Sequence, residues 1–510
     1  WFLQQSFDQK LNYIMVALNH MSDEELIELL SVSQSDLDRN RPHDGYIDHD
    51  SVGLIDSDNA KIVLHSNSIS ILGGNDNSET PDWAEPYMQI DDTLMSTIDN
   101  AQQYIANGME QRVTIRNESN VTNIEANVAT TFNRETGEKL RFSFNGDDEI
   151  YLTVPELVDI KITDFCPYGC SYCYQDSTVD GLHADKDTLF AMVDHMRTLG
   201  VFELAIGGGE PTLYPNFLEL LDYASPDIVP NFTTRNLAFF KQDLSTVSTV
   251  LRQIGGFAYS VDTPSDVERY ADLMEYWHNQ AERYYMECKL NPTKLIDDNG
   301  TTSTLYQEIM TKLVTAVSFQ VVLGVSTREE YQTLVESINK VSLQCVDLRD
   351  SMLSLWDDTR KIIYQFLRDN TNLTHRYYER LYVEENDIPT IMLLGYKTTG
   401  RGSKPTYDYY DTALSDVISK SRNMSLGIDT AAAQQMSEQL KQLKIDPTTY
   451  YVKEGVASCY IDAVNSTMSA SSYGSDVDAG KMDEYTDERF VETFNKYQKN
   501  SLSSIPLQLI

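Results

Sequence analysis

The chain has 510 residues, a formal net charge of −38 and only six cysteines. A surface this acidic repels nucleic-acid backbones and anionic membranes, and six cysteines in so long a chain do not make a disulfide framework. Hydrophobic residues form 41% of the chain, enough for a sizeable core, and no apolar run is long enough to span a membrane. The length predicts two or three domains, or one large α/β domain with additions.

The start of the chain shows no signal peptide, because its first segment is amphipathic and has no small-residue cleavage site. The first residue is Trp1 instead of Met, so we expect that earlier residues are missing from this sequence. The low cysteine usage fits a reducing compartment. We therefore expect a cytoplasmic protein.

The first 152 residues are predicted to form an α+β accessory domain. Apolar spacing predicts a helix over 2–20, the capping box "SDEE" predicts a second helix from Ser22, and 91–107 look helical as well. Residues 45–90 are rich in Asp, Asn, Ser and Gly and contain strand-like pieces such as "KIVLH". The segments "QRVTIR", "NVATTFN", "KLRFSFN" and "EIYLTV", separated by turn signals, predict an antiparallel meander that ends near 153.

From 155 onward, strand-like and helical segments alternate. The predicted strands are "LVDIKIT", "VFELAIG", "DIVPNFTT", "FAYSVD", "FQVVLGV" and "PTIMLLGY", and the first helices are "KDTLFAMVDHMRTL", "NFLELLDYA" and "TVSTVLRQI". This alternation predicts an α/β fold with a parallel sheet, because parallel neighbours need crossover connections. Ligands of such sheets sit at the carboxyl ends of the strands. The loops after the first two strands should therefore face one site.

The end of the chain, 466–510, is predicted to be an acidic extension rich in Ser, Gly and Asp. It contains "DERFVETFNKY", in which Phe490, Phe494 and Tyr497 share one face of an amphipathic helix. We expect this helix to dock on the core.

Three cysteines, Cys166, Cys170 and Cys173, lie within "DFCPYGCSYCYQD" with the spacing C-x3-C-x2-C. A structural zinc site needs four closed ligands, and His183 is the only nearby candidate for the fourth. A zinc ribbon would show a second C-x2-C pair, which the sequence lacks. The other cysteines, predicted to be buried small hydrophobic residues, are Cys288, Cys345 and Cys459.

A [4Fe–4S] cluster explains three clustered thiols better than zinc does. Such a cluster has four irons, so three thiolates leave one iron for a ligand that the protein does not supply. The sequence therefore predicts that a substrate or cofactor completes the coordination.

The motif "CPYGCSYC" resembles the signature of the radical S-adenosylmethionine (SAM) superfamily. "GGGEP" (207–211) is similar to the GGE motif of that family, "YSVD" (259–262) resembles its fourth-strand segment, and "LLGYKTTGRG" (393–402) resembles its sixth-strand loop. The resemblance covers roughly 155–470. It implies a partial (β/α)6 barrel over 153–465, preceded by the accessory domain and followed by the acidic extension.

The resemblance also implies the site residues. Cys166, Cys170 and Cys173 would hold the cluster, and no residue is assigned a catalytic role. The implied SAM contacts are Tyr172 near the adenine, Gly208, Gly209 and Glu210 at the methionyl amine, Ser260 and Asp262 at the ribose, and Leu394 and Gly395 after the sixth strand.

Several of these SAM contacts have a plainer interpretation. Tyr172 would serve loop packing, and Ser260 and Asp262 would cap a strand end. Arg235, which stands where the family commonly has Asn, would bind the SAM carboxylate or be a surface arginine. The glycines are expected to let the backbone approach the ligand, and Glu210 is expected to have little to pack against.

The implied activity is reductive cleavage of SAM to methionine and a 5′-deoxyadenosyl radical, which takes hydrogen from a substrate. The region 454–473 resembles the segment after the barrel in peptide-modifying members, although Cys459 is its only cysteine, so we expect no auxiliary cluster. The implied partners are a peptide or protein substrate and an electron donor such as flavodoxin or ferredoxin.

Two other functions stay open. The first is radical SAM modification of a nucleotide or nucleic acid, which the acidity disfavours. The second is a barrel without turnover that has a structural or binding role. Residues 1–152 would recruit the substrate or a partner protein through a strand edge, or would serve as a structural cap or an oligomer contact. We also expect the amino-terminal domain to cover the mouth of the barrel.

Overall fold

The computed structural model describes most of the chain after residue 111 and three strands before it. The helices predicted over 2–20, from Ser22 and over 91–107 lie outside the described residues. Within the described residues, no helix combines the length and the apolar character needed to cross a membrane. The described ranges are 51–57, 60–65, 69–73, 112–116, 119–125, 128–143, 152–297, 301–370, 388–402, 404–420, 424–445, 454–473, 480–481 and 486–501.

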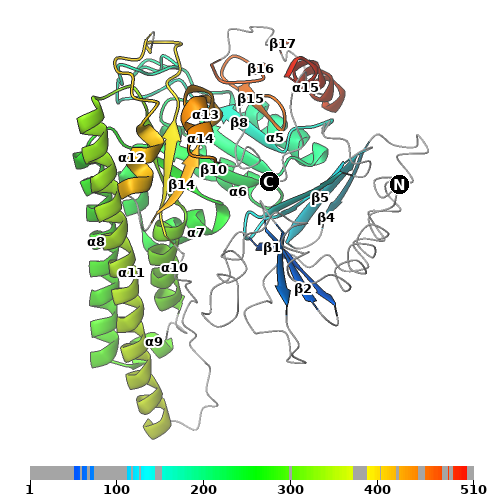
Figure 1. The fold of residues 1–510 in the computed structure, drawn as a ribbon. Helices are drawn as coiled ribbons and strands as arrows, with labels where there is room; N and C mark the ends of the chain where they lie inside the picture. Colours follow the sequence, from blue (N-terminus) through cyan, green and yellow to red (C-terminus); the bar gives the residue numbers. More distant parts are fainter. Residues whose placement is uncertain are drawn as a thin grey trace.

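The largest element is a ten-stranded sheet with the order β14-β13-β12-β11-β10-β9-β8-β15-β16-β17 (Figure 1). Strands β8 to β14 run parallel to one another, and β15 runs parallel to β8. The hairpin partners β16 and β17 are antiparallel. The bounds are β8 Leu157–Lys161, β9 Glu203–Gly207, β10 Val229–Thr234, β11 Phe257–Ser260, β12 Val317–Val322, β13 Thr390–Leu394, β14 Ser425–Ile428, β15 Ser458–Asp462, β16 Thr467–Ser469 and β17 Gly480–Lys481.

The predicted α/β class with a parallel sheet is confirmed. The six strands predicted after residue 155 correspond to β8 to β13. Strands β14 and β15 were not predicted. β15 extends the sheet beyond β8, so a segment near the end of the chain lies beside the strand that leads into the cysteine loop.

Side chains of the parallel strands alternate between two environments. On β8, Val158 and Ile160 are fully buried toward the helices, whereas Asp159 and Lys161 line a cavity on the other face. β12 repeats the pattern, with Val317, Phe319 and Val321 buried and Gln320 in the cavity. This period of two is inherent to strands, and it places polar side chains such as Asp159, Lys161 and Gln320 on the inner face.

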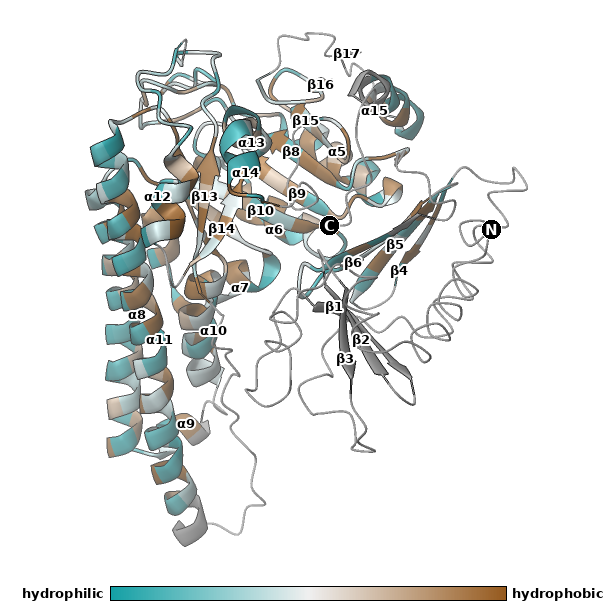
Figure 2. Cartoon of the chain, viewed as in Figure 1, coloured by the Kyte–Doolittle hydropathy of each residue, from teal (hydrophilic) through white to brown (hydrophobic). Residues whose placement is uncertain are grey.

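Helices cover the outer face of the sheet, and α8 and α11 lie side by side (Figure 1). Hydrophilic residues run along the side of α8 that faces away from the sheet (Figure 2), as expected for an amphipathic surface helix. The bounds are α5 Lys186–Leu199, α6 Phe217–Ala224, α7 Leu244–Gln253, α8 Pro264–Leu290, α9 Thr293–Asp297, α10 Thr301–Thr315, α11 Arg328–Asn370, α12 Ala413–Lys420, α13 Thr430–Gln435, α14 Ser437–Gln442 and α15 Asp487–Ser501, with 3-10 turns η4 Pro211–Leu213 and η5 Leu237–Lys241.

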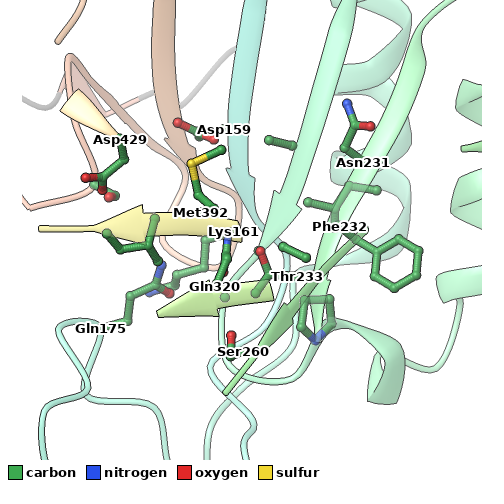
Figure 3. Close-up of a pocket in the computed structure, with 18 of the residues that line it drawn as sticks. Asp159, Lys161, Gln175, Asn231, Phe232, Thr233, Ser260, Gln320, Met392 and Asp429 are labelled. Atoms are coloured by element: carbon green, nitrogen blue, oxygen red, sulfur yellow. The ribbon is translucent and has the colours of Figure 1, made fainter. Parts of the chain in front are cut away.

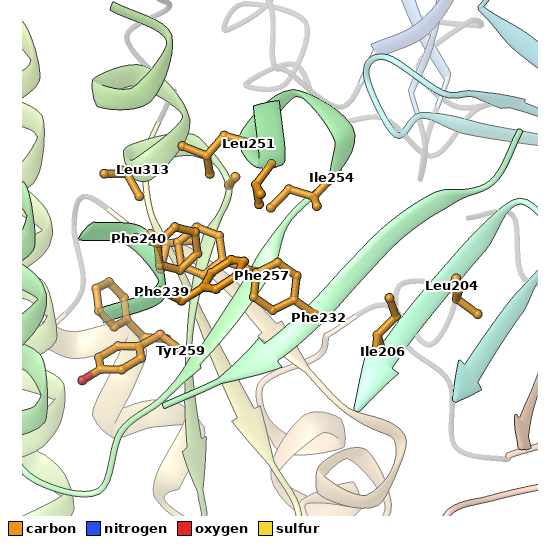
Figure 4. Packing of buried hydrophobic residues seen from close by; sticks show 14 of the residues in the cluster. Leu204, Ile206, Phe232, Phe239, Phe240, Leu251, Ile254, Phe257, Tyr259 and Leu313 are labelled. Carbon is orange, nitrogen blue, oxygen red and sulfur yellow. The ribbon is translucent and has the colours of Figure 1, made fainter. Parts of the chain in front are cut away.

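Aromatic residues pack the middle of the sheet against its helices (Figure 4). Phe240 lies 4.5 Å from Phe257 between ring centroids, and Phe232 lies 5.9 Å from Phe239 in an edge-to-face arrangement. Such ring pairs contribute about 0.5–1.5 kcal/mol each beyond their buried area. They fix β10 and β11, whose carboxyl ends carry three of the predicted SAM contacts, Arg235, Ser260 and Asp262.

A second sheet precedes the parallel one. It is the antiparallel meander β4 Arg112–Arg116, β5 Asn120–Glu125, β6 Val128–Asn133 and β7 Lys139–Ser143. An antiparallel meander was predicted here, but the prediction missed β5. A strand was also predicted at "EIYLTV"; residues 152–154 of that segment are described and do not form a strand. A separate three-stranded antiparallel sheet consists of β1 Ser51–Ser57, β2 Ala60–His65 and β3 Ile69–Gly73, and β2 contains the predicted "KIVLH".

The meander packs against the amino-terminal ends of the parallel strands. Phe132 stacks on Phe202 with ring centroids 5.3 Å apart, and Arg141 forms a buried ion pair with Glu156 at 2.5 Å. Phe202 and Glu156 directly precede β9 and β8. The cysteine loop follows the other end of β8, so the expectation that this domain covers the mouth of the barrel is wrong for the described strands β4 to β7.

The predicted docking helix is present as α15. Phe490 and Phe494 are fully buried in the main core, and the side chain of Tyr497 lies outside the described residues. His195 of α5 pairs with Asp487 at 2.6 Å. The helix therefore closes the outer layer beside α5, as its apolar face predicted.

Candidate functional site

A cavity of about 850 Å³ lies on the inner face of the sheet and opens toward the carboxyl ends of the strands (Figure 3). Every site residue predicted from the sequence lines it. These residues are Cys166, Cys170, Tyr172, Cys173, Gly208, Gly209, Glu210, Arg235, Ser260, Asp262, Leu394 and Gly395.

The three cysteines are half-buried free thiols on the loop after β8. The backbone N–H of Cys166 donates to the carbonyl of Thr178 at 2.8 Å, and that of Cys173 donates to the carbonyl of Cys170 at 3.3 Å. Burial raises the pKa of the Cys166 and Cys170 thiols, with smaller contributions from the neighbouring thiols. A bound metal centre would supply the positive charge that favours the thiolates.

Among the described residues, no three His, Cys, Asp or Glu side chains are arranged around a single metal ion. His183 is held instead by a 2.8 Å hydrogen bond between its Nδ1 and the Thr163 hydroxyl. An iron–sulfur cluster binds each thiolate to a different iron, so its ligands need not converge on one point. The soft donor set and its place in the cavity fit a cluster better than zinc.

The glycine loop after β9 packs against the cysteine loop. The backbone N–H of Gly209 donates to the carbonyl of Thr163 at 2.7 Å. A Cβ on Gly208, which has φ +129°, would lie 2.4 Å from that carbonyl, and one on Gly209 would lie 2.1 Å from the carbonyl of Phe165. The close contact between the two loops is therefore a structural reason for these glycines. Both also line the cavity, and their contact with a ligand stays a prediction. Of the three glycines of this loop, only Gly207 has room for a Cβ, which would meet nothing within 4 Å.

The carboxylate of Glu210 is buried, with 2% of the residue exposed. Its Oε1 accepts from the hydroxyls of Thr212 at 2.7 Å and Thr234 at 2.6 Å, and its Oε2 accepts from the backbone N–H of Arg235 at 2.9 Å. The expectation that this carboxylate has little to pack against is wrong. Glu210 links the glycine loop to the end of β10.

Arg235, Tyr172 and Asp262 join three loops at the mouth of the cavity. Arg235 donates to the Tyr172 hydroxyl and to Asp262 at 2.5 Å each, and the Tyr172 hydroxyl donates to Asp262 at 2.5 Å. The alternative of a surface arginine does not describe this arrangement, because the guanidinium of Arg235 is paired inside the cavity. Its contact with the SAM carboxylate stays a prediction. Burial, followed by the charge of Asp262, raises the pKa of Tyr172 above its usual range.

A group of charged side chains deeper in the cavity was not predicted. Asp159 on β8 and Asp429 after β14 lie on the same side of the cavity (Figure 3). The ammonium of Lys397 lies 3.8 Å from Asp429 and stacks over the rings of Tyr174 and Tyr473 at 4.7 and 5.0 Å. The only signal in the sequence was a charge inside the apolar strand "LVDIKIT".

Two carboxyls of this group titrate near neutrality. Burial raises the pKa of Asp159 to about 6, although Lys397 opposes the shift. Burial likewise raises the pKa of Glu454, which accepts a hydrogen bond from the Tyr473 hydroxyl at 3.1 Å, to about 7. The charge of the cavity wall therefore becomes more negative between pH 5 and pH 8.

Replacing Asp159 by asparagine should make stability depend less on pH. The pKa of Asp159 is higher in the folded state than in the unfolded state, so the folded state binds the proton more tightly. The wild-type protein therefore loses stability as the pH rises from about 4 to about 6. The stability gap between Asp159→Asn and wild type should widen by about 1 kcal/mol between pH 5 and pH 7, measured by urea unfolding. The exposed Asp272→Asn is the control, and parallel curves for Asp159→Asn would contradict the prediction.

The other three cysteines are buried, as predicted. Cys459 lies on the outer face of β15, packed in the main core. Of the remaining predicted residues, Gly395 donates its backbone N–H to Asp429 at 2.8 Å, and Ser260 and Leu394 line the cavity wall.

Residues 160–284 match the family model described as the Radical SAM superfamily. The matched residues contain the cysteine loop, the glycine loop and the Arg235–Asp262 pair. This family implies a [4Fe–4S] cluster and SAM as cofactors.

Curated relatives match only over short segments. Mycofactocin maturase MftC of Mycobacterium ulcerans (strain Agy99) is 33% identical over 75 residues, which are 14% of this chain and 20% of the relative. PqqA peptide cyclase of Bradyrhizobium diazoefficiens is 28% identical over 98 residues, 19% of this chain and 26% of the relative. The matched segments thus span about a fifth to a quarter of these relatives.

Solved structures with a similar chain trace include Streptococcus suis SuiB. SuiB bound to S-adenosylmethionine has a TM-score of 0.42 and 11% identity, with 77% of this chain and 89% of SuiB covered. SuiB bound to its precursor peptide SuiA has a TM-score of 0.42 and 12% identity, with 74% and 88% covered.

Proposed function

We propose that this protein is a radical SAM enzyme that acts on a peptide or protein. The observation that carries the proposal is the convergence of three thiols, the glycine loop and the Arg235–Asp262 pair on one cavity at the carboxyl ends of parallel strands. A cluster held there supplies, when bound, the electron for reductive cleavage of SAM to methionine and a 5′-deoxyadenosyl radical that abstracts hydrogen from the substrate.

The chain's own residues would bind and orient the cofactors. Cys166, Cys170 and Cys173 would hold the cluster. The ends of β9, β10 and β11, tied together by Glu210 and Arg235, would form a fixed wall for SAM. Preorganised polar groups in a cavity that excludes bulk water hold a ligand without further rearrangement.

The peptide substrate is supported by the name of one matched relative, PqqA peptide cyclase. The acidic character of the chain, −38 overall, disfavours a nucleic-acid substrate. The cavity of about 850 Å³ extends past the cysteines to Asp159 and Glu454, which leaves room for a substrate side chain below the cofactors. An external one-electron donor, such as flavodoxin or ferredoxin, would reduce the cluster.

The test is formation of 5′-deoxyadenosine by the anaerobically reconstituted protein with SAM and a chemical reductant. We expect 5′-deoxyadenosine and methionine in equal amounts, dependent on the reductant. A protein that binds the cluster and SAM but releases no 5′-deoxyadenosine would instead be a barrel without turnover.

A further inference from the structure

The loop after β13, residues 397–402, lies against the cysteine loop although the two are far apart in the sequence. The Thr399 hydroxyl donates to the carbonyl of Tyr174 at 3.1 Å across 225 residues. The backbone N–H of Arg401 donates to the carbonyl of Cys173 at 3.0 Å. The β13 loop therefore bonds to the backbone at the third cysteine and at the residue after it.

The guanidinium of Arg401 reaches three further points of the cysteine loop. Its Nε donates to the carbonyl of Cys170 at 3.0 Å, and its terminal nitrogens donate to the carbonyl of Ser177 at 2.9 Å and to the carboxylate of Asp176 at 3.0 Å. A planar guanidinium presents five donors in a fixed arrangement, which a lysine ammonium does not. One side chain thus ties together both ends of the segment that carries Cys170 and Cys173.

Two glycines of the same loop make this approach possible. A Cβ on Gly400, which has φ +58°, would lie 2.6 Å from the carbonyls of Cys173 and Tyr174. A Cβ on Gly402 would lie 2.7 Å from the carbonyl of Tyr172. The backbones are in contact at these points, so the spacing between the loops leaves no room for a side chain.

We propose that Arg401 is a positioning residue for the cluster, acting through the backbone of Cys170 and Cys173. This inference rests on the proposed function. The hydrogen bonds of Arg401 keep the second and third thiols in place, so the cluster is released more slowly. The positive charge of Arg401, which Asp176 offsets only in part, lies at the backbone of the cysteine loop. It would stabilise the more negative, reduced form of the cluster, because local charge is one determinant of its reduction potential.

The experiment compares wild type, Arg401→Met, Arg401→Lys and the control Arg328→Met in the full chain without SAM. Arg328 pairs with Asp416 through two hydrogen bonds of 2.9 and 3.0 Å between α11 and α12, away from the cysteine loop. After anaerobic reconstitution, the readouts are the rate of iron extraction by a chelator and the midpoint potential of the cluster, followed by electron paramagnetic resonance.

We expect Arg401→Met to release iron roughly tenfold faster than wild type, as the loss of several hydrogen bonds to charged donors implies, and to have a more negative midpoint potential. Arg401→Lys keeps the charge but not the multidentate contact, so it should release iron as fast as Arg401→Met while retaining a potential near that of wild type. Arg328→Met should match wild type in both measurements.

Wild-type values for Arg401→Met in both measurements would overturn the inference and leave the proposed function intact. If Arg401→Met does not fold, Thr399→Val tests the inference instead, because it removes only the hydrogen bond to Tyr174. Faster iron release from Thr399→Val would support the positioning role of the loop, and release at the wild-type rate would contradict it. A wild-type protein that takes up no cluster would overturn the proposed function itself, and the inference with it.

Discussion

Replacing Cys166, Cys170 and Cys173 together by alanine should abolish iron binding after anaerobic reconstitution. Wild type should take up about four irons per chain, the content of one [4Fe–4S] cluster. All three thiols line the cavity and are half-buried, and the triple variant leaves no thiol on this loop. Iron and sulfide are measured chemically, and the cluster absorbance is followed in parallel.

Cys459→Ala is the matched control for this experiment. Cys459 is buried on the outer face of β15 and packs in the main core, so its replacement should leave the iron content unchanged. A lower iron content in this control would point to an auxiliary cluster. Iron retained by the triple variant, or zinc alone in wild type, would refute the assignment of the three cysteines.

Glu210→Gln should destabilise the protein even without cofactors, by about 1–3 kcal/mol, the range for leaving buried polar groups without suitable partners. The carboxylate accepts from two hydroxyls and from the backbone N–H groups of Thr212 and Arg235, and Gln can offer only one accepting oxygen. The two hydroxyls cannot simply turn, because Thr234 already accepts from the backbone N–H of Asn236 at 2.8 Å and Thr212 accepts from its amide at 3.0 Å. Urea unfolding of the apo protein measures the loss.

The same substitution should weaken SAM binding, because Glu210 holds the glycine loop next to the end of β10. Calorimetric titration of the reconstituted variant measures this effect. Glu219→Gln, on the exposed side of α6, is the control and should leave both stability and SAM affinity nearly unchanged. Wild-type stability together with wild-type SAM affinity in Glu210→Gln would show that neither role is correct.

The amino-acid sequence by itself determined the local features of this protein. The spacing of Cys166, Cys170 and Cys173, the glycine motif and the alternation of strands and helices are all set by neighbours in the chain. Periods of 2 and 3.6 residues report which face of a strand or helix is buried, so β8 to β13 and the helix containing Phe490 and Phe494 were predicted. The boundary near 153 and the roles of the individual SAM contacts stay predictions.

Only the tertiary structure decided how these pieces meet. β15 pairs with β8 from the far end of the chain, Lys397 and Glu454 reach the same cavity wall as Asp159, and the meander contacts the end of the barrel away from the cysteines. Arg401 binds the cysteine loop across 231 residues. Contacts of this kind depend on loop lengths and on packing between distant segments, and no periodicity within a short window records them. For the same reason, the sequence did not predict that the cysteine loop leaves no room for side chains at Gly208 and Gly209.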